Sequence, residues 1–251
     1  MGGDLQGKVA VVTGAGRGIG KSIARRLAAQ GARVALAART ESQLSAVASS
    51  IEEVVPDSTT NAPRTLTVPT DVREEPSVRH LMGEVRQTYG RLDILVNSAG
   101  VLTKKPLEQT SSEEWDQIME VNARGPFLVC REAIPLLRET DDGLRYVVNI
   151  ASVVGIKGYV GQGAYTASKH ALMGLSKVLS KELEDDGIRV HAICPGGVAT
   201  EMVKESRPDL DESVLMEPDD IADIVEFLVT RQGNAVVDQV KVRRQASDPW
   251  F

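Results

Sequence analysis

The chain has 251 residues, 42% of them apolar and 25% charged, and a formal net charge of −6, which fits a single soluble α/β domain over residues 1–251 and argues against nucleic acid and anionic membranes as partners. The two cysteines lie in apolar stretches and the three histidines are scattered, so neither a disulfide framework nor a metal site is expected. No apolar run reaches the roughly 18 residues of a transmembrane helix, and the first residues lack a secretory signal, which makes the cytoplasm the expected compartment.

Seven short apolar runs alternate with longer segments of helical periodicity. The first run is KVAVVTG at residues 8–14 and the last is QVKVRR at residues 239–244. This alternation predicts βαβ units, and nearly continuous apolar runs are typical of strands covered on both faces. We therefore expect a Rossmann-type, doubly wound α/β fold with a mainly parallel seven-stranded sheet and helices on both faces. The helical patterns lie at 18–30, 41–54, 76–89, 112–138, 164–185 and 218–232.

Two stretches interrupt this alternation. Residues 55–63 (VPDSTTNAP) are typical of a lengthened surface connection. Residues 198–217 follow the sixth predicted strand and lack clear periodicity. Because ligands of open α/β sheets bind beyond the carboxyl ends of the strands, residues 198–217 are a candidate substrate lid, and a plain surface loop is the alternative.

Four glycines follow the first predicted strand within the segment TGAGRGIG, residues 13–20. Gly14 permits a tight turn, Gly18 lets a ligand approach the backbone, and Gly20 lets the helix pack closely on the strand. The N-terminus of that helix offers free N–H groups and a partial positive charge to a pyrophosphate. The segment therefore predicts a dinucleotide site, although its T-G-x3-G-x-G spacing differs from G-x-G-x-x-G and from a P-loop.

Tyr165 and Lys169, in YTASK, occupy positions i and i+4 and therefore share one face of a helix; it is the resemblance to a known family that makes them the candidate catalytic pair. Ser152 lies just after the fifth predicted strand, and Asn122 lies upstream in VNARG. Addition of hydride to a carbonyl puts negative charge on its oxygen, which must be stabilised and protonated. We expect Tyr165 to donate that proton, Ser152 to bond the carbonyl oxygen, and the Lys169 ammonium to lower the pKa of the phenol.

In their order these motifs resemble the short-chain dehydrogenase/reductase family over nearly the whole chain, and the 3-oxoacyl-carrier-protein reductases are the branch most similar to it. The resemblance implies a catalytic set of Asn122, Ser152, Tyr165 and Lys169, in which Asn122 anchors a water that connects Lys169 to solvent. It also implies a nicotinamide dinucleotide cofactor. The residues that it assigns to this cofactor are Gly14, Arg17, Gly18, Ile19, Gly20, Arg39, Asp71, Val72, Asn97, Ala99, Gly100, Tyr165, Lys169, Pro195, Gly196, Val198 and Thr200.

Particular roles within this cofactor set also follow from the resemblance. Asp71 would accept a hydrogen bond from the adenine amino group, while Val72 would pack on the ring. Family members usually have two asparagines where this chain reads NSAG, with Ser98 in the second place. The Val198 backbone would meet the carboxamide, and Thr200 would contact carboxamide or phosphate.

The end of the second predicted strand indicates which cofactor is used. By resemblance, an acid at this point would bind a ribose 2′-OH, but the chain has Ala38 followed by Arg39. Arg17 and Arg39 are two guanidinium groups that would flank a 2′-phosphate. NADP(H) is therefore expected rather than NAD(H), mainly on Ala38 and Arg39, because Arg17 also occurs in NAD-dependent members.

The substrate is less defined by the sequence. Partners of acidic carrier proteins usually carry basic patches, whereas residues 139–145 and 184–189 are acidic here. We therefore expect an oxidoreductase acting on a carbonyl or secondary alcohol of a small molecule. The alternatives are a 3-oxoacyl-thioester reductase, a non-catalytic nucleotide-binding protein, and an epimerase or dehydratase. The resemblance also implies a homodimer or homotetramer paired through residues 112–138 and 164–185.

Overall fold

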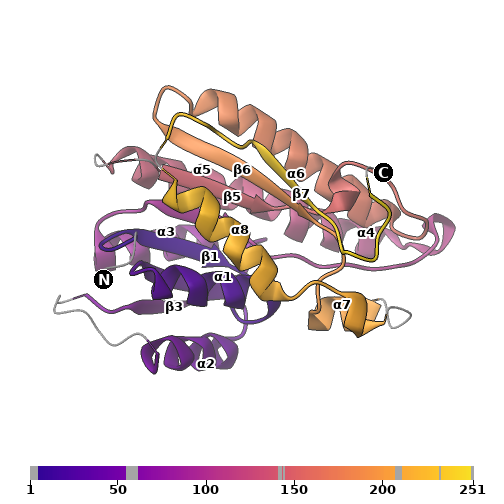
Figure 1. The fold of residues 1–251 in the computed structure, drawn as a ribbon, viewed down its shortest axis with the longest axis horizontal. Coiled ribbons are helices and arrows are strands. Elements are labelled where there is room, and N and C mark those ends of the chain that lie inside the picture. The colour runs from indigo at the N-terminus through magenta and orange to yellow at the C-terminus, as the bar shows by residue number, and fades with distance from the viewer. Residues whose placement is uncertain are drawn as a thin grey trace.

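The computed structural model describes residues 5–54, 62–140, 143, 145–206, 211–231 and 233–249. Its seven strands lie in the order β3-β2-β1-β4-β5-β6-β7, and every neighbouring pair is parallel (Figure 1). This confirms the predicted Rossmann-type α/β fold, with a sheet that is parallel throughout. The strands are β1 (Val9–Thr13), β2 (Arg33–Ala38), β3 (Thr65–Pro69), β4 (Ile94–Asn97), β5 (Arg145–Ile150), β6 (Ile188–Pro195) and β7 (Gln239–Val242).

Helices cover both faces of this sheet (Figure 1). Side chains of α1, α2 and α8 pack on one face, and those of α3, α5 and α6 pack on the other. In β1, Ala10 and Val12 face the first group while Val9 and Val11 face the second, which explains why this run is apolar throughout. Within the described residues, no helix is long and apolar enough to cross a membrane. The α-helices are α1 (Gly18–Ala29), α2 (Glu41–Glu52), α3 (Glu75–Tyr89), α4 (Ser112–Met119), α5 (Gly125–Arg138), α6 (Gly163–Glu182), α7 (Glu201–Ser206) and α8 (Pro218–Thr230).

The helix predicted at 112–138 is interrupted. The structure has α4, then a π-helical turn η2 (Glu120–Arg124), then α5. Pro126 has no N–H to donate to the carbonyl of Asn122, four residues earlier, so an unbroken α-helical pattern cannot pass this point. The interruption places Asn122 in the π turn, a geometry that is frequent at functional sites.

The candidate lid at 198–217 contains short helices rather than a plain loop. Helix α7 is capped by Thr200, whose hydroxyl accepts from the N–H of Val203 at 3.3 Å. A 3₁₀ turn η4 (Glu212–Val214) follows, and two backbone hydrogen bonds join the flanks of the segment at Gly197–Ala199 and Met216. Residues 207–210 of this segment, and 55–61 of the predicted surface connection, lie outside the described residues.

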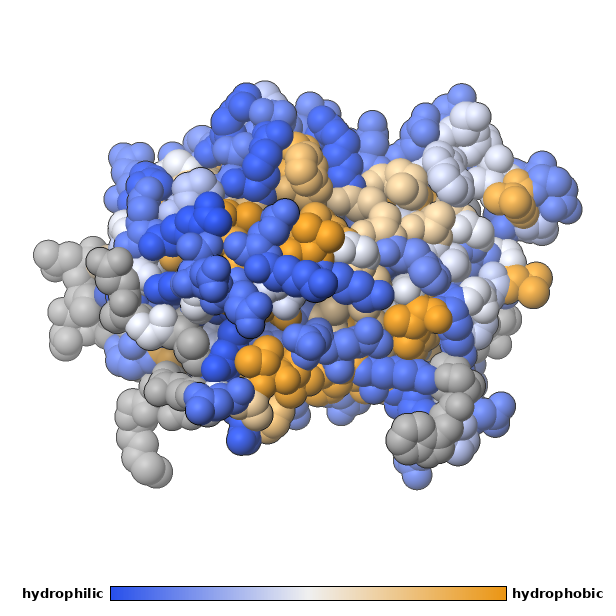
Figure 2. Space-filling model, turned by 90° about the horizontal axis from the view of Figure 1, so that it is seen from above, coloured by the Kyte–Doolittle hydropathy of each residue, from blue (hydrophilic) through white to orange (hydrophobic). Residues whose placement is uncertain are grey.

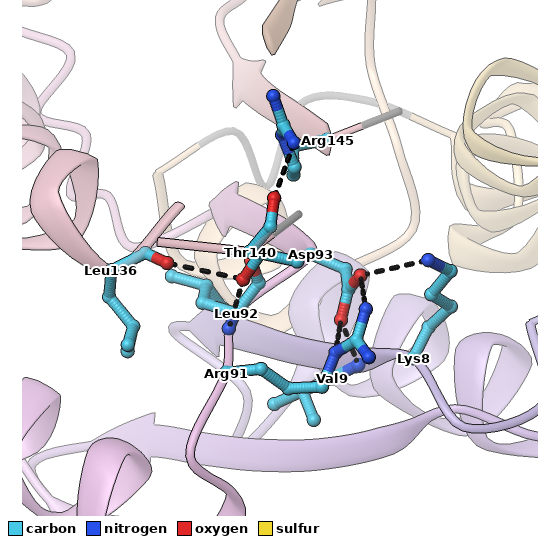
Figure 3. A network of polar contacts seen from close by, with 8 residues as sticks. All are labelled: Lys8, Val9, Arg91, Leu92, Asp93, Leu136, Thr140 and Arg145. Carbon is cyan, nitrogen blue, oxygen red and sulfur yellow. Dashed lines mark hydrogen bonds and ion pairs between the residues drawn. The ribbon is translucent and has the colours of Figure 1, made fainter. Parts of the chain in front are cut away.

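A polar network closes the amino end of the sheet (Figure 3). The Asp93 carboxylate, only 1% exposed, accepts the N–H of Val9 at 2.9 Å and a guanidinium fork from Arg91 at 2.7 and 2.9 Å. Lys8 adds an ion pair at 3.1 Å. Because Lys8 and Val9 begin β1 while Arg91 and Asp93 lead into β4, the network fixes these two strands to each other.

Candidate functional site

A cleft of about 450 Å³ lies beyond the carboxyl ends of the strands. Its walls come from the glycine loop after β1, the segments that follow β2 to β6, the first turns of α6 and the start of α7. Asn97 and Asn122 are the only predicted site residues that do not line it. Those that do are Gly14, Arg17, Gly18, Ile19, Gly20, Arg39, Asp71, Val72, Ala99, Gly100, Ser152, Tyr165, Lys169, Pro195, Gly196, Val198 and Thr200.

The glycine loop has the shape of a cradle that side chains would fill. Gly14 has φ of +68°, and a Cβ there would lie 2.8 Å from the Cα of Ala99. Gly18 has φ of +54°, and a Cβ on Gly20 would collide with the Gly14 carbonyl oxygen. Arg17 forms the N-cap of α1 without a side-chain capping bond, and no acidic residue lies in the first turn. The helix N-terminus therefore keeps N–H groups and a partial positive charge for an anion.

Positive charge gathers at the end of the cleft formed by the segments after β2 and β3. Arg17 and Arg39 are exposed there, and Ala38 brings no carboxylate. The Asp71 carboxylate is bound by the guanidinium of Arg73, with Nη2 to Oδ2 at 2.7 Å and Nε to Oδ1 at 3.0 Å. Arg73 first, and Arg39 to a lesser degree, hold the pKa of Asp71 below its usual value, so Asp71 stays ionised.

Ser152, Tyr165 and Lys169 meet at the other end of the cleft. Lys169 is 4% exposed, its Nζ lies 5.8 Å from the centroid of the Tyr165 ring, and it donates to the carbonyl of Ile150 at 2.9 Å. Ser152 is the N-cap of the 3₁₀ turn η3 (Val153–Gly155), which directs its side chain to the strand ends. Its hydroxyl makes a long contact of 3.4 Å with the carbonyl of Pro195.

The expected lowering of the Tyr165 pKa by Lys169 is wrong for this structure. Burial raises the pKa of Tyr165 to about 12, against a smaller lowering from its hydrogen bond with Ser152. Burial also lowers the pKa of Lys169 to about 8. Both groups have lost water, so each pKa is shifted toward the neutral form by desolvation.

Asn122 lies behind the cleft and connects two of its walls. Its Oδ1 accepts the N–H of Val101 at 2.9 Å, while its Nδ2 donates to the Val101 carbonyl at 2.8 Å and to Ser168 Oγ at 3.1 Å. Ser168 in turn donates to the carbonyl of Tyr165 at 2.8 Å. The side chain thus holds the segment after β4 against the turn of α6 that carries Tyr165, and its predicted water stays a prediction.

Asn97, assigned to the cofactor by resemblance, points into the core. It is 2% exposed, and its Nδ2 donates to Asn149 Oδ1 at 2.9 Å and to Cys130 Sγ at 3.3 Å. Its amide supports β4 against β5 and α5. Gly100 instead brings the backbone into the cleft, since a Cβ there would lie 3.8 Å from Lys169 Nζ.

Sequence reasoning missed other residues around the cleft. Met202 and Val203 line it from α7, and Gln43 lines it from α2. Thr200 reaches the glycine loop, with its Cγ2 3.1 Å from the place of a Cβ on Gly18. In the sequence, the threonine at position 200 is a possible helix cap, and this is the signal by which α7 could have been predicted. No local pattern marks Gln43 or Arg73.

The described residues of the acidic stretches at 139–145 and 184–189, which include Glu139 but not 141 and 142, do not border the cleft. They lead into the amino ends of β5 and β6, whereas the cleft lies beyond the carboxyl ends. Glu139 pairs with Arg86 at 2.5 Å, and Asp186 pairs with Arg138 at 2.7 Å. The expectation that these acids repel a carrier protein at the cleft is therefore wrong, because the parallel topology puts them at the amino ends of the strands, opposite the cleft.

Comparisons with known proteins agree with this geometry. The family model described as short chain dehydrogenase matches residues 8–211. An uncharacterized oxidoreductase of Staphylococcus aureus (strain MRSA252) is 35% identical over 239 residues, which cover 95% of this chain and 98% of that protein. An alcohol dehydrogenase from the archaeon Thermococcus sibiricus, complexed with 5-hydroxy-NADP, superposes with a TM-score of 0.87 at 28% identity, covering 97% of this chain and 99% of that one. A 3-ketoacyl-(acyl-carrier-protein) reductase from Brucella melitensis, complexed with NADH, gives a TM-score of 0.82 at 30% identity, covering 95% and 97%.

Proposed function

Because the chain belongs to the short-chain dehydrogenase/reductase family, we propose that it is an oxidoreductase that uses NADP(H) to interconvert a carbonyl group and a secondary alcohol of a small molecule. One observation carries this proposal. Ser152, Tyr165 and Lys169 line the same cleft as the glycine loop, so a proton donor and a dinucleotide cradle open onto one space. A binding protein without activity has no need of Ser152, Tyr165 and Lys169 in this cleft.

The cleft fits a dinucleotide in shape and charge. The glycine loop leaves the room that a Cβ would fill, and the uncapped N-terminus of α1 suits a pyrophosphate. Lys169 and Gly100 would hold the nicotinamide ribose in the part of the cleft that Tyr165 also lines. When bound there, the nicotinamide supplies or accepts the hydride.

The charges at the other end support NADP(H) over NAD(H). Arg17 and Arg39 are exposed beside Ala38, and the only carboxylate among the lining residues near them, Asp71, is already bound by Arg73. A ribose 2′-OH finds no acceptor of the usual kind there, whereas a 2′-phosphate meets two guanidinium groups. The related structures hold 5-hydroxy-NADP in one case and NADH in another, so they support a nicotinamide cofactor without choosing between the two.

The proton is handled by Tyr165 and Lys169. A phenol with a pKa of about 12 stays protonated at neutral pH, which is the form that donates to a carbonyl oxygen as negative charge develops on it. Ser152 donates a second hydrogen bond to that oxygen. Lys169, with a pKa of about 8, is charged at neutral pH yet close to its titration point, so it can return a proton to the phenolate. This pattern favours reduction at neutral pH, because oxidation needs the phenolate.

A 3-oxoacyl-thioester reductase is the second candidate. The Brucella melitensis reductase favours it, and the described acids Glu139, Glu184, Asp185 and Asp186 do not argue against it, because they precede β5 and β6 at the amino ends of the strands. A coenzyme A thioester and a carrier-protein thioester share the reacting group, so an assay with both separates a thioester reductase from an enzyme of small carbonyl compounds.

The test is a panel of ketones, aldehydes and 3-oxoacyl thioesters, with NADPH and NADH oxidation followed at 340 nm in parallel. We expect turnover of at least one carbonyl class, with kcat/KM higher for NADPH than for NADH. Binding of both cofactors without oxidation of either over the whole panel would contradict the enzymatic proposal. A higher kcat/KM with NADH would contradict only the choice of cofactor.

A homodimer or homotetramer is part of the proposal. Trp115, Phe127 and Val178 are large apolar side chains that stay exposed on α4, α5 and α6, the helices through which the family resemblance implies pairing. On the face seen in Figure 2, apolar side chains lie in patches between hydrophilic ones. Sedimentation of the purified chain measures the oligomeric state, and a monomer at micromolar concentration would contradict it.

A further inference from the structure

We propose that Arg73 fixes the carboxylate of Asp71 so that one of its oxygens is left to accept a hydrogen bond from an adenine amino group, which makes Arg73 a positioning residue for base selectivity. The inference rests on the proposed function, because it concerns the adenine half of the cofactor. It assigns a role to a side chain that does not itself line the cleft.

The contacts between Arg73 and Asp71 use most of the acceptor capacity of the carboxylate. Oδ1 accepts the backbone N–H of Arg73 and its Nε, both at 3.0 Å. Oδ2 accepts Nη2 at 2.7 Å and shares the Nε at a longer 3.1 Å. An ionised carboxylate has about four lone-pair sites. Because the Nε–H is divided between both oxygens, three N–H groups use about three of these four sites, which leaves room for one further donor.

Neighbouring elements hold this pair in place from both sides. The backbone N–H of Asp71 donates to Ser77 Oγ of α3 at 3.1 Å, and the N–H of Glu74 donates to the Asp71 carbonyl at 3.1 Å. The guanidinium of Arg124, at the end of the π turn, donates to the backbone carbonyl of Arg73. The backbone that carries the fork is thus tied to α3 and η2, which fixes where the Asp71 and Arg73 side chains begin.

The pair is also placed where an adenine ring would lie. Asp71 lines the cleft with its side chain 23% exposed, next to Val72. Val72 is packed close enough to Gly125 that a Cβ there would lie 2.8 Å from its Cγ2, so it too is fixed. A carboxylate held ionised by Arg73 accepts hydrogen bonds and donates none. It therefore accepts from the amino group of adenine and repels the carbonyl oxygen that hypoxanthine has in its place.

Binding measurements test this inference without turnover. Isothermal titration calorimetry gives the Kd of NADPH and of its hypoxanthine analogue for the full chain and for Arg73→Ala and Arg73→Lys. A hydrogen bond to a charged group corresponds to roughly a 10- to 100-fold difference in Kd. We expect the unmodified chain to bind NADPH tighter by such a factor and Arg73→Ala to reduce it to about threefold or less. Arg73→Lys keeps the charge but not the fork, so its Kd ratio should lie between that of the unmodified chain and that of Arg73→Ala.

Arg79→Ala is the matched control, because Arg79 forms an ion pair with Glu75, Nη1 to Oε1 at 2.6 Å, on the exposed side of α3. It should leave the Kd ratio unchanged. Equal weakening of both ligands in Arg73→Ala, with the ratio preserved, would overturn the positioning role, and circular dichroism melts check that the variants are folded. Equal affinity of the unmodified chain for both ligands would overturn the inference while leaving the proposed function intact. Failure to bind either ligand would overturn both.

Discussion

The two ends of the parallel sheet differ in how far their buried charges are compensated by partners. At the amino end, the Asp93 carboxylate is 1% exposed and is met by the Val9 N–H, the Arg91 fork and Lys8 (Figure 3). At the carboxyl end, Lys169 is 4% exposed, and its described hydrogen bond goes to a neutral carbonyl, that of Ile150. Charge compensation is therefore complete at one end and partial at the other.

This difference indicates which end is built for stability and which for chemistry. The buried Asp93 carboxylate has its hydrogen-bond and ion-pair partners within the fold, and removing one side of such a group leaves the other unpaired. A buried ammonium without a carboxylate partner has its pKa lowered to about 8, and its tyrosine neighbour has its pKa raised to about 12. Perturbed pKa values that arise from burial in a cleft are typical of functional sites.

The largest expected effect is on stability at the amino end. Asp93→Ala leaves two cations and the Val9 N–H without their shared acceptor, so we expect the free energy of unfolding to fall by roughly 3 kcal/mol. Urea denaturation measures it, and kcat/KM per folded molecule should not change. Asp185→Ala, at an exposed carboxylate, is the control and should stay within about 0.5 kcal/mol. Equal losses in the two variants would contradict the assignment.

At the carboxyl end, removal of the buried charge is expected to raise the free energy of unfolding rather than to lower it. The folded pKa of Lys169, about 8, lies below its ordinary value of 10.5. Below pH 8 the fold therefore bears the cost of holding a charge that the unfolded chain holds in water, and this cost is relieved as the pH rises toward 10.5. Lys169→Met should stabilise the fold at pH 7, by about 1 to 2 kcal/mol, while turnover is lost. Destabilisation at pH 7 would show that the charge is fully compensated.

A substitution at the cofactor end of the cleft is expected to change the cofactor preference, as a smaller effect, and to leave the free energy of unfolding unchanged. Arg39→Asp replaces a cation beside the 2′-phosphate position with an anion, so we expect the ratio of kcat/KM for NADPH over NADH to fall about 10- to 100-fold. Arg25→Asp changes the net charge equally from the exposed side of α1 and is the control. An unshifted ratio in Arg39→Asp would remove the 2′-phosphate interpretation.

The pH dependence of activity follows from the same values. Lys169 is charged below pH 8 and neutral above it, so its hold on the cofactor and its ability to return a proton both weaken as the pH rises. Carbonyl reduction at saturating substrate should fall progressively above about pH 8. A rate that stays level to pH 10 would contradict the role of the ammonium.

The smallest expected effect concerns His191 on β6. It is 2% exposed, its Nδ1 donates one hydrogen bond to the Val237 carbonyl at 2.7 Å, and burial lowers its pKa below 6.5. As the pH falls through 6.5, the unfolded chain binds a proton that the folded chain does not, so stability falls. The free energy of unfolding should decrease between pH 7 and pH 5, and His191→Asn should flatten that slope. Identical slopes would contradict it.

The fold could be predicted from the sequence because its signals are local. Alternating apolar runs and helical patterns mark the strands and helices, and the glycines after β1 mark the turn at the cleft. The π turn was missed because the helical periodicity continues through it, although Gly125 and Pro126 already interrupt the backbone pattern. The residues near the cleft followed from the resemblance: all of the residues that it assigned except Asn97 and Asn122 line the cleft, while their roles stay predictions.

The electrostatics of the site could not be predicted in the same way. Whether Lys169 lowers the pKa of Tyr165 depends on how much water each loses, and burial is decided by segments distant in the sequence. The Asp71–Arg73 fork depends on side-chain rotamers that no pattern encodes. The position of the acidic stretches, by contrast, follows from the topology, since every segment that precedes a parallel strand lies at the amino end of the sheet.

The most direct test is a single-turnover measurement of NADPH oxidation with the best substrate of the panel, in the unmodified chain and in Tyr165→Phe, with Tyr159→Phe as the control at an exposed tyrosine outside the cleft lining. Loss of the proton donor should slow the chemical step by about 10²- to 10⁴-fold, with the Kd of NADPH unchanged and the control at the original rate. An undiminished rate in Tyr165→Phe would contradict the assignment of Tyr165 as the proton donor at the carboxyl end of the sheet.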